Sequence, residues 1–205
     1  MRNFGKFMDF IRRRSQISES LINDNSPLLL HISDTPSQFY PELSRIINLI
    51  NPEYIIHTGD LADNIKIELS SGLLSKYQYE VNKLLEMLNT SDVKNILISL
   101  GNHDNYDIIN ENKGKLQIYN EIGEVEIRDN KFVFSHYSDY ISKKDADVYM
   151  FGHNPDIKTR ITDSGIYLNG MPAINIINLN TLEVECIEYP YGTNSLRFNQ
   201  KRIRI

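Results

Sequence analysis

The 205-residue chain contains a single cysteine, Cys186, and no long uninterrupted run of apolar residues. One cysteine excludes an internal disulfide, and this favours a reducing, cytoplasmic setting. No apolar stretch approaches the roughly 18 residues that a membrane-spanning helix needs, so we do not expect a transmembrane protein. The N-terminus has no uninterrupted apolar segment of the kind that a cleaved signal peptide carries. Repeats, low-complexity tracts and a linker to a second domain are also missing, so the sequence predicts one domain.

Charge is unevenly distributed along the chain. The net charge is −5, but residues 1–22 carry +3 and residues 193–205 carry +4, so the remaining body carries −12. An acidic body repels the phosphate backbone of nucleic acids. We therefore expect no strong nucleic-acid binding, and any such binding would have to come from the two basic ends.

Both basic ends have a predicted structure. Apolar residues recur with the spacing of one helix face at Phe4, Phe7, Met8 and Ile11, which predicts a basic amphipathic helix within residues 1–25. Such a helix usually packs on its own domain or on a second subunit, so a homo-oligomer is one expectation. Attachment to an anionic membrane surface or to a nucleic acid stays open. Residues 191–205 are predicted to form a basic, solvated or loosely docked tail.

The first half of the chain alternates predicted strands with predicted helices. The strands are expected at 28–33, 54–58 and 95–100. The helix faces between them consist of Leu43, Ile46, Ile47 and Ile50, and of Leu74, Tyr77, Val81, Leu84, Leu85 and Leu88. Strands that are apolar throughout are typical of a mainly parallel sheet that helices cover on both faces.

The second half of the chain consists of short predicted strands separated by turn signals. The strands are expected at 115–120, 123–128, 131–135, 147–151, 157–161, 165–168, 173–178 and 182–188, with one short helix near 138–144. The two halves most simply form two sheets packed face to face, with helices outside. The expected fold class is therefore α/β.

Five of the predicted strands end in a side chain that can bind a metal. The residues at or just after these ends are Asp34, Asp60, the tetrapeptide Gly101-Asn102-His103-Asp104, His136 and the pair Gly152-His153. Aspartate and histidine brought together at one edge of a sheet predict a metal site. Imidazole and carboxylate ligands together suit Mn, Fe, Zn, Co or Ni. Asp60 has two oxygens that could bridge two metals, and Asn102 offers a neutral oxygen.

In order, approximate spacing and position at strand ends, these five pieces resemble the motifs of the calcineurin-like metallophosphoesterases. The resemblance covers residues 28–188. It implies a four-layer αββα sandwich of two mixed sheets within residues 26–190, with a binuclear centre that hydrolyses phosphoesters. Paired metals in such a centre hold the phosphate and activate the attacking water. It also implies that His103 acts beside the leaving group as a general acid, with Asp104 as its orienting partner.

Two motif positions depart from the family pattern, which is Asp-x-His near the start and Gly-His-x-His near the end. This chain has Pro36 and Pro155 where the family has histidine. In the family both missing histidines bind the same metal, so that position keeps only Asp34 and the shared Asp60. The other position keeps its full set, which is Asp60, Asn102, His136 and His153. We expect one firmly bound divalent transition metal and a second site that is absent, weak or completed by Asp156, Gln38 or His31.

The predicted function is metal-dependent hydrolysis of a small phosphomonoester, phosphodiester or nucleotide. The alternative is a catalytically weak or inactive scaffold for protein interactions, because a loss of ligands fits such a change. Against a scaffold, both His103 and Asp104 are present although a scaffold does not need them. A nuclease is disfavoured, because the sequence shows no added domain of the kind that such enzymes usually carry. The segment 59–64 has no arginine, unlike the protein serine/threonine phosphatases, so a phosphoprotein substrate is disfavoured.

Three further polar residues near the motifs have simpler interpretations. His31 and His57 lie inside apolar strands and are expected to be hydrogen-bonded core residues. Asp63 follows Asp60 closely and is expected to cap the next segment.

Overall fold

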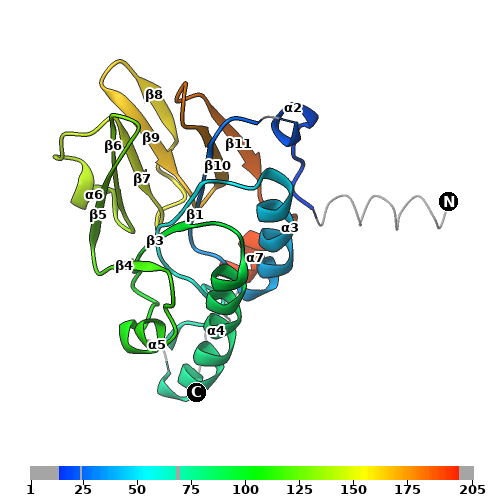
Figure 1. The fold of residues 1–205 in the computed structure, drawn as a ribbon. Coiled ribbons are helices and arrows are strands. Elements are labelled where there is room, and N and C mark those ends of the chain that lie inside the picture. Colours follow the sequence, from blue (N-terminus) through cyan, green and yellow to red (C-terminus); the bar gives the residue numbers. More distant parts are fainter. Residues whose placement is uncertain (1–13, 24, 68–69, 199–205) are drawn as a thin grey trace.

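A computed structural model of the chain describes residues 14–23, 25–67 and 70–198, and in it two β-sheets pack face to face with helices outside (Figure 1). The amphipathic helix predicted from Phe4 to Ile11 lies outside the described residues, so it and the oligomer expected from it stay predictions. The described part of residues 1–25 contains one short helix, α2 (Glu19–Ile22), capped by the Ser18 side chain. Within the described ranges, no helix combines the length and the apolar character needed to cross a membrane.

The first sheet has six strands in the order β11-β10-β1-β2-β3-β4. Their bounds are β1 (Leu28–Ile32), β2 (Tyr54–His57), β3 (Asn95–Ser99), β4 (Gln117–Tyr119), β10 (Ala173–Asn178) and β11 (Val184–Glu188). Strands β1 to β4 run parallel, whereas β10 and β11 join antiparallel on the β1 side. The three strands predicted for the first half of the chain are confirmed, and each ends one residue earlier than expected. Strands β4, β10 and β11 come from the second half of the chain, so the expectation that each half forms its own sheet is wrong.

The second sheet has five strands in the order β5-β6-β7-β9-β8. Their bounds are β5 (Ile122–Ile127), β6 (Asn130–Ser135), β7 (Val148–Phe151), β8 (Arg160–Thr162) and β9 (Gly165–Asn169). The three central strands run parallel and the two edge strands antiparallel. Only β8 departs clearly from prediction, because it begins three residues later than the expected 157–161.

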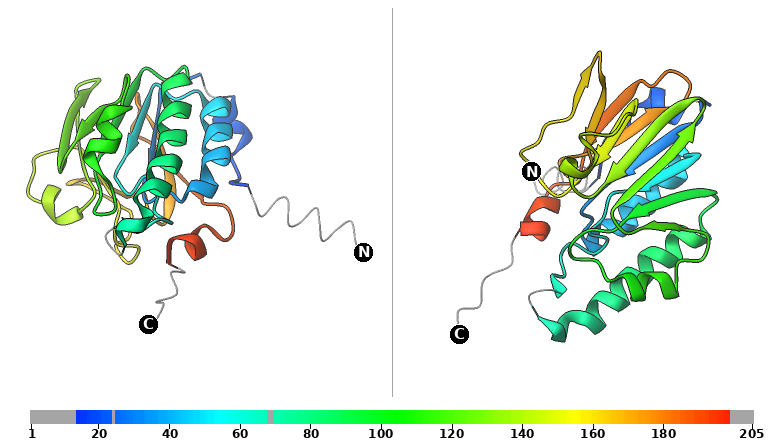
Figure 2. Two further views of the ribbon diagram at one scale, coloured as in Figure 1. Left: turned by 90° about the horizontal axis from the view of Figure 1, so that it is seen from below. Right: turned by 90° about the vertical axis from the view of Figure 1, so that its left-hand side faces the viewer.

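Two long helices, α3 (Tyr40–Ile50) and α4 (Leu74–Thr90), lie side by side on the outer face of the six-stranded sheet (Figure 2). Nearly all the residues predicted for their buried faces are buried. The exception is Leu74, which is 41% exposed because it is the first residue of α4. Helix α3 ends where Asn51 adopts a left-handed conformation with φ 41°, directly before Pro52.

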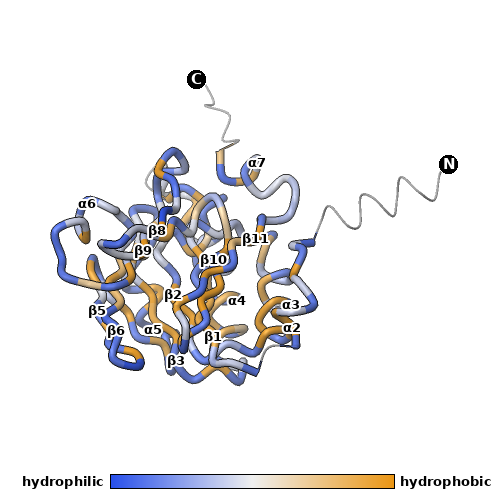
Figure 3. Tube along the Cα trace, turned by 90° about the horizontal axis from the view of Figure 1, so that it is seen from above, coloured by the Kyte–Doolittle hydropathy of each residue, from blue (hydrophilic) through white to orange (hydrophobic). Residues whose placement is uncertain are grey.

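A second apolar core fills the space between the two sheets. It contains Leu29, Ile56 and Leu97 from the first sheet and Phe132, Phe134, Val148 and Met150 from the second. Apolar residues follow the strands, and polar residues gather in the connecting loops (Figure 3). A short helix, α6 (Ser138–Ile141), covers the outer face of the second sheet and is shorter than the predicted 138–144. The four-layer αββα sandwich is confirmed.

The C-terminal region differs from the predicted tail. Residues Thr193–Phe198 form a helix, α7, and its Arg197 is only 1% exposed. The Arg197 guanidinium donates hydrogen bonds to the backbone carbonyls of Asp34 (2.6 Å), Met171 (2.5 Å) and Ser33 (3.2 Å). A side chain with five donors is well suited to satisfy several buried carbonyls at once. This part of the chain therefore supports the loop after β1, and residues 199–205 lie outside the description.

Replacing Arg197 by methionine should lower the free energy of unfolding by about 3 kcal/mol, because three buried carbonyls lose a charged donor. Denaturant unfolding of the full chain measures this. The matched control is Arg128→Met, since Arg128 pairs with Glu53 at the surface (2.8 Å) and both side chains are at least 40% exposed. It should cost less than about 1 kcal/mol. Equal losses in the two variants would contradict the assigned role of Arg197.

Candidate metal centre

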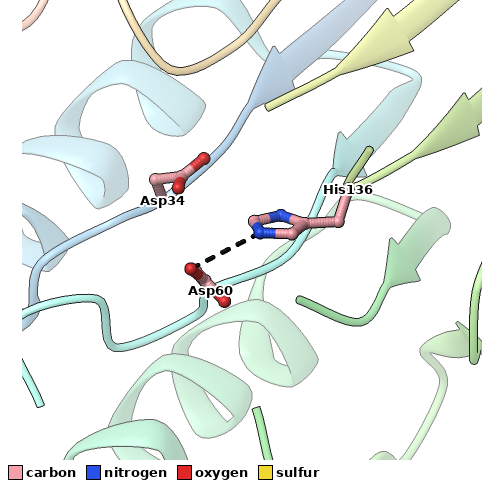
Figure 4. Close-up of side chains that lie close together, drawn as sticks. All are labelled: Asp34, Asp60 and His136. Atoms are coloured by element: carbon pink, nitrogen blue, oxygen red, sulfur yellow. Dashed lines mark ion pairs between the residues drawn. The ribbon is translucent and has the colours of Figure 1, made fainter. Parts of the chain in front are cut away.

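The carboxyl ends of five parallel strands meet at one edge of the sandwich. Strands β1, β2 and β3 are parallel within one sheet, and β6 and β7 are parallel within the other. Ligands of open α/β sheets bind at such strand ends. The loops that follow these strands carry Asp34, Asp60, Asn102, His136 and His153. Figure 4 shows the His136 imidazole pointing toward the carboxylates of Asp34 and Asp60.

Three of these residues have an uncommon backbone conformation. Asp34, Asp60 and His153 have φ angles of 52°, 57° and 63°. The left-handed region is costly for residues other than glycine, and such strain concentrates at functional sites.

Four nitrogen and oxygen atoms converge around the His136 ring. Its Nε2 lies 3.1 Å from Asn102 Oδ1, 3.1 Å from His153 Nδ1 and 3.5 Å from Asp60 Oδ2. Ligand atoms about 2.1 Å from a tetrahedral metal lie about 3.4 Å from one another. The three distances from His136 Nε2 are close to this value, although His153 belongs to neither of the two groups of mutually close Asp and His ligand atoms. The four converging residues are those predicted to form the complete metal position.

Hydrogen bonds orient the donor atoms of this group. His136 Nδ1 lies 2.7 Å from the Thr58 carbonyl, which can only accept, so Nδ1 carries the proton and Nε2 keeps its lone pair. Asp60 Oδ1 accepts from the His103 backbone N–H (2.9 Å), which leaves Oδ2 facing His136. The Tyr137 hydroxyl donates to Asn102 Oδ1 (3.2 Å). Outer hydrogen bonds of this kind fix the orientation of metal ligands.

Asp34 lies beside this group. Its Oδ2 accepts from Ser33 Oγ (2.6 Å) and from the His153 backbone N–H (3.0 Å). Asp34, Asp60 and His136 are all buried, and each offers one atom of a group whose atoms lie within 4.8 Å of one another. Pro36 and Pro155 provide no side-chain ligand.

The three residues considered as replacements for the lost histidines lie elsewhere. His31 is fully buried and its ring contacts Thr58 Oγ1 and Asn175 Nδ2, both at 3.1 Å. Gln38 and Asp156 are exposed. Neither His31 nor Asp156 belongs to a metal-ligating group among the described residues.

The structure places Asp104 differently from the prediction, which made it the partner of the His103 ring. Its Oδ2 accepts from the backbone N–H groups of Asp60 (2.8 Å) and Gly101 (2.9 Å). Its Oδ1 accepts from the Leu61 N–H (2.9 Å) and the Tyr77 hydroxyl (3.0 Å). Asp104 therefore fixes two loops to each other. A carboxylate placed one residue after a histidine turns away from its ring here, because the backbone offers it more donors.

The carboxylates near the His103 ring are those of Asp60 and Asp63. His103 Nε2 lies 3.7 Å from Asp60 Oδ2 and 3.9 Å from Asp63 Oδ1. Asp63, expected to be a helix cap, is 1% exposed, and its Oδ1 contacts the ammonium of Lys66. Sequence reasoning missed Lys66. The spacing Asp-x-x-Lys directly after the Gly59-Asp60 motif was the available signal.

Burial and mutual repulsion raise the carboxylate pKa values in this cluster. Burial, followed by the charges of Asp34, Asp104 and Asp63, holds the pKa of Asp60 well above its usual range. Burial and the charge of Asp34 raise the pKa of Asp63 to about 7, although Lys66 opposes the shift. Burial and the neighbouring His136 lower the pKa of His153. A bound cation would offset the repulsion among these carboxylates.

Close approach between the loops requires glycine at two motif positions. A Cβ at Gly101 would overlap the Asp60 carboxylate, and one at Gly152 would overlap the hydroxyl of Ser33. The glycines of the tetrapeptide and of the Gly152-His153 pair therefore let the ligand-bearing loops of different strands touch.

The sequence model of the calcineurin-like phosphoesterase family matches residues 27–185, more than half of the chain. The chain belongs to this family. Calcineurin-like phosphoesterases are hydrolases that act on phosphoester bonds and depend on divalent metals, which agrees with the donor set above. A search of curated proteins finds no significant match.

Several solved structures are similar to this chain. A novel archaeal phosphodiesterase is 21% identical, covers 78% of this chain and 99% of its own, and superposes with a TM-score of 0.57. YfcE, a phosphoesterase from E. coli, is 12% identical. The match covers 80% of this chain and 99% of YfcE, with a TM-score of 0.48. Vacuolar protein sorting 29 from Cryptosporidium parvum is 16% identical. The match covers 80% of this chain and 98% of that protein, with a TM-score of 0.44.

The two strand histidines were predicted to be core residues, and their contacts agree. His57 Nε2 lies 2.9 Å from Thr35 Oγ1, and both histidines are 0% exposed. Burial lowers the pKa of His31 to about 3, and burial together with the charge of His31 lowers the pKa of His57 to about 3. The unfolded chain therefore binds protons at these rings below pH about 6.5, whereas the folded chain does not.

This difference predicts how stability depends on pH. Each ring contributes stability that is fully present above pH about 6.5 and is lost as pH falls toward 3, at up to about 1.4 kcal/mol per pH unit. His57→Gln should flatten the acid side of the curve of unfolding free energy against pH, relative to the parent. Denaturant unfolding between pH 4 and 8, with a chelator in the buffer, measures this curve. The raised carboxylate pKa values act in the opposite direction but are common to both proteins. Thr35→Val, which keeps the imidazole, should lower stability without flattening the curve. Parallel curves for parent and His57→Gln would contradict the assignment.

Proposed function

We propose that this chain hydrolyses a small phosphoester with one divalent transition metal held by Asp60, Asn102, His136 and His153. The convergence of four ligand atoms at parallel strand ends, in a calcineurin-like phosphoesterase, carries the proposal. When bound there, such a metal supplies a Lewis acid for the phosphate and lowers the pKa of a water molecule. The second metal position of the family is degraded, because Pro36 and Pro155 provide no ligand.

The protein's own residues bind and orient the substrate in this proposal. Asn102 and His153 lie on the exposed side of the metal group, whereas Asp34, Asp60 and His136 form its buried floor. The phosphate therefore enters from the side of Asn102 and His153.

An aromatic surface borders that entrance. The Tyr137 ring lies 4.6 Å from the His153 ring and 5.2 Å from the ring of Tyr140, which is 45% exposed. We propose that these tyrosines contact an aryl or nucleoside leaving group.

His103 is the proposed proton donor to the leaving group. Its side chain is 15% exposed, and its Nε2 lies 3.7 Å from Asp60 Oδ2, so it borders both the metal group and the solvent side. In place of Asp104, the carboxylates of Asp60 and Asp63 face its ring.

Substrates of this site are small phosphomonoesters, phosphodiesters or nucleotides. A structural neighbour is described as a phosphodiesterase, which favours including diesters in the assay. The test is hydrolysis of p-nitrophenyl phosphate and bis-p-nitrophenyl phosphate with Mn, Fe, Zn, Co and Ni, alongside metal content per chain. Metal binding without turnover on either ester would instead favour the scaffold interpretation.

Replacing His136 or His153 by alanine should lower metal affinity by more than the roughly 10- to 100-fold that loss of an outer partner causes. The reason is that each removes one of four ligand atoms. Metal content after gel filtration measures the effect. His103→Ala is the matched control, since it should keep the metal and lose about 10²–10⁴-fold in turnover. Full metal loading in both the His136 and His153 variants would refute the ligand assignment.

Restoring the family pattern tests the degraded second position. Pro36→His together with Pro155→His should raise metal stoichiometry from one toward two and should raise turnover, provided the loops tolerate the loss of two fixed φ angles. Either change alone should do less, because three ligands hold a metal less tightly than four. Two tightly held metals in the unmodified protein would contradict the idea.

A further inference from the structure

Asp63 is a buried carboxylate that the family motifs discussed above leave without a role. Two backbone hydrogen bonds fix its position: Thr35 N–H donates to the Asp60 carbonyl and Asp63 N–H to the Thr35 carbonyl, both at 3.0 Å. The loop after β1 and the loop after β2 are thereby tied together. Asp63 is 1% exposed, so its carboxylate is held beside Asp60 and away from bulk water.

Asp60, Asp63 and His103 form a second group of metal-ligating side chains. One atom from each lies within 4.8 Å of the others, and Asp60 is shared with the group around Asp34 and His136. This arrangement of two groups around one bridging aspartate has the outline of a two-cation centre. The second group, however, contains neither of the positions at which the family histidines would stand.

A cation already contacts this second group. The Lys66 ammonium contacts Asp63 Oδ1, and the Lys66 side chain is only 15% exposed. The other oxygen, Asp63 Oδ2, is buried and has no hydrogen-bond partner. A buried carboxylate with one unsatisfied oxygen and one cation contact indicates a site built for positive charge.

An ammonium and a divalent ion compete for such a place. Both would place positive charge on Asp63, but two cations on the same carboxylate would repel each other strongly at low local dielectric. Lysine is a compact point charge with three donors, and it needs no fixed coordination geometry. It can therefore supply positive charge at Asp63 without a metal ion.

We propose that Asp60, Asp63 and His103 form a second cation site, which the ammonium of Lys66 fills in place of a second metal ion. The inference rests on the proposed function, in that the first metal occupies the neighbouring group. It explains how the centre balances the charges of Asp34, Asp60 and Asp63 although the chain has Pro36 and Pro155.

The test is a titration of the metal-free full chain with Mn²⁺, followed by calorimetry and by metal analysis. The parent should bind one Mn²⁺. Lys66→Met and Lys66→Gln should bind two, the second at least tenfold more tightly than any second site of the parent. Lys66→Arg keeps the charge and should bind one. The glutamine variant retains a polar contact to Asp63, so it serves if the methionine variant does not fold.

Two further variants control for the substitution itself. Lys83 forms the same i,i+3 ion pair with Glu80 (3.1 Å), but on the outer surface of α4, where its side chain is 47% exposed. Lys83→Met should bind one Mn²⁺, like the parent. Adding Asp63→Asn to Lys66→Gln removes a ligand of the second site and should return the stoichiometry from two to one.

The outcomes separate this inference from the proposed function. One Mn²⁺ in the parent and in both neutral Lys66 variants would overturn the role of Lys66 and leave the first metal site intact. Two tightly bound Mn²⁺ in the parent would also overturn it, because Asp63 would then hold a metal with Lys66 displaced. No Mn²⁺ in any variant would overturn the proposed function itself.

Discussion

One buried carboxylate, that of Asp104, holds the loops of the metal centre together. It accepts hydrogen bonds from backbone N–H groups of the loop after β2 and of the loop after β3, and from Tyr77 on helix α4. A carboxylate that accepts several backbone donors replaces water that these groups would otherwise need. Because Asp60 and Asn102 lie on these two loops, the distance between them depends on Asp104. The ligands from the second sheet are then placed by the packing of the two sheets.

The loop after β1 is supported from the opposite side. Arg197 reaches it from the C-terminal helix and satisfies the carbonyls of Ser33 and Asp34. Asp34, which has a left-handed backbone conformation, is held in place by this contact. The loops of the centre are thus held by the Asp104 carboxylate, which accepts from N–H groups, and by the Arg197 guanidinium, which donates to carbonyls. Neither Asp104 nor Arg197 belongs to the four-atom group around His136.

The proposed asymmetry of the centre has an electrostatic basis. Burial, together with the charges of neighbouring carboxylates, raises the pKa values of Asp60 and Asp63. In the family pattern, histidine side chains help to bind two metals, and these metals offset the charge of such a carboxylate cluster. In this chain, one metal on His136 and His153 and one ammonium on Asp63 would provide the positive charge.

Much of the fold and the site was predictable from local sequence patterns. Continuous apolar strands, amphipathic helices and turn residues predicted most strands and the two long helices, because burial of an apolar face favours one element type. The assignment of strands to sheets was not predicted, because β4, β10 and β11 join the first sheet through tertiary pairing. The strand-end positions of Asp34, Asp60, Asn102, His136 and His153 followed from the same pattern. The partners of Asp104, the burial of Arg197, and the pairing of Asp63 with Lys66 beside His103 were decided only by the tertiary structure. Most of these contacts join residues that are 26 to 164 positions apart or cross between loops. Local sequence could place Asp63 and Lys66 within reach of each other, but only the packing of two loops against the sheet buried them at the metal centre.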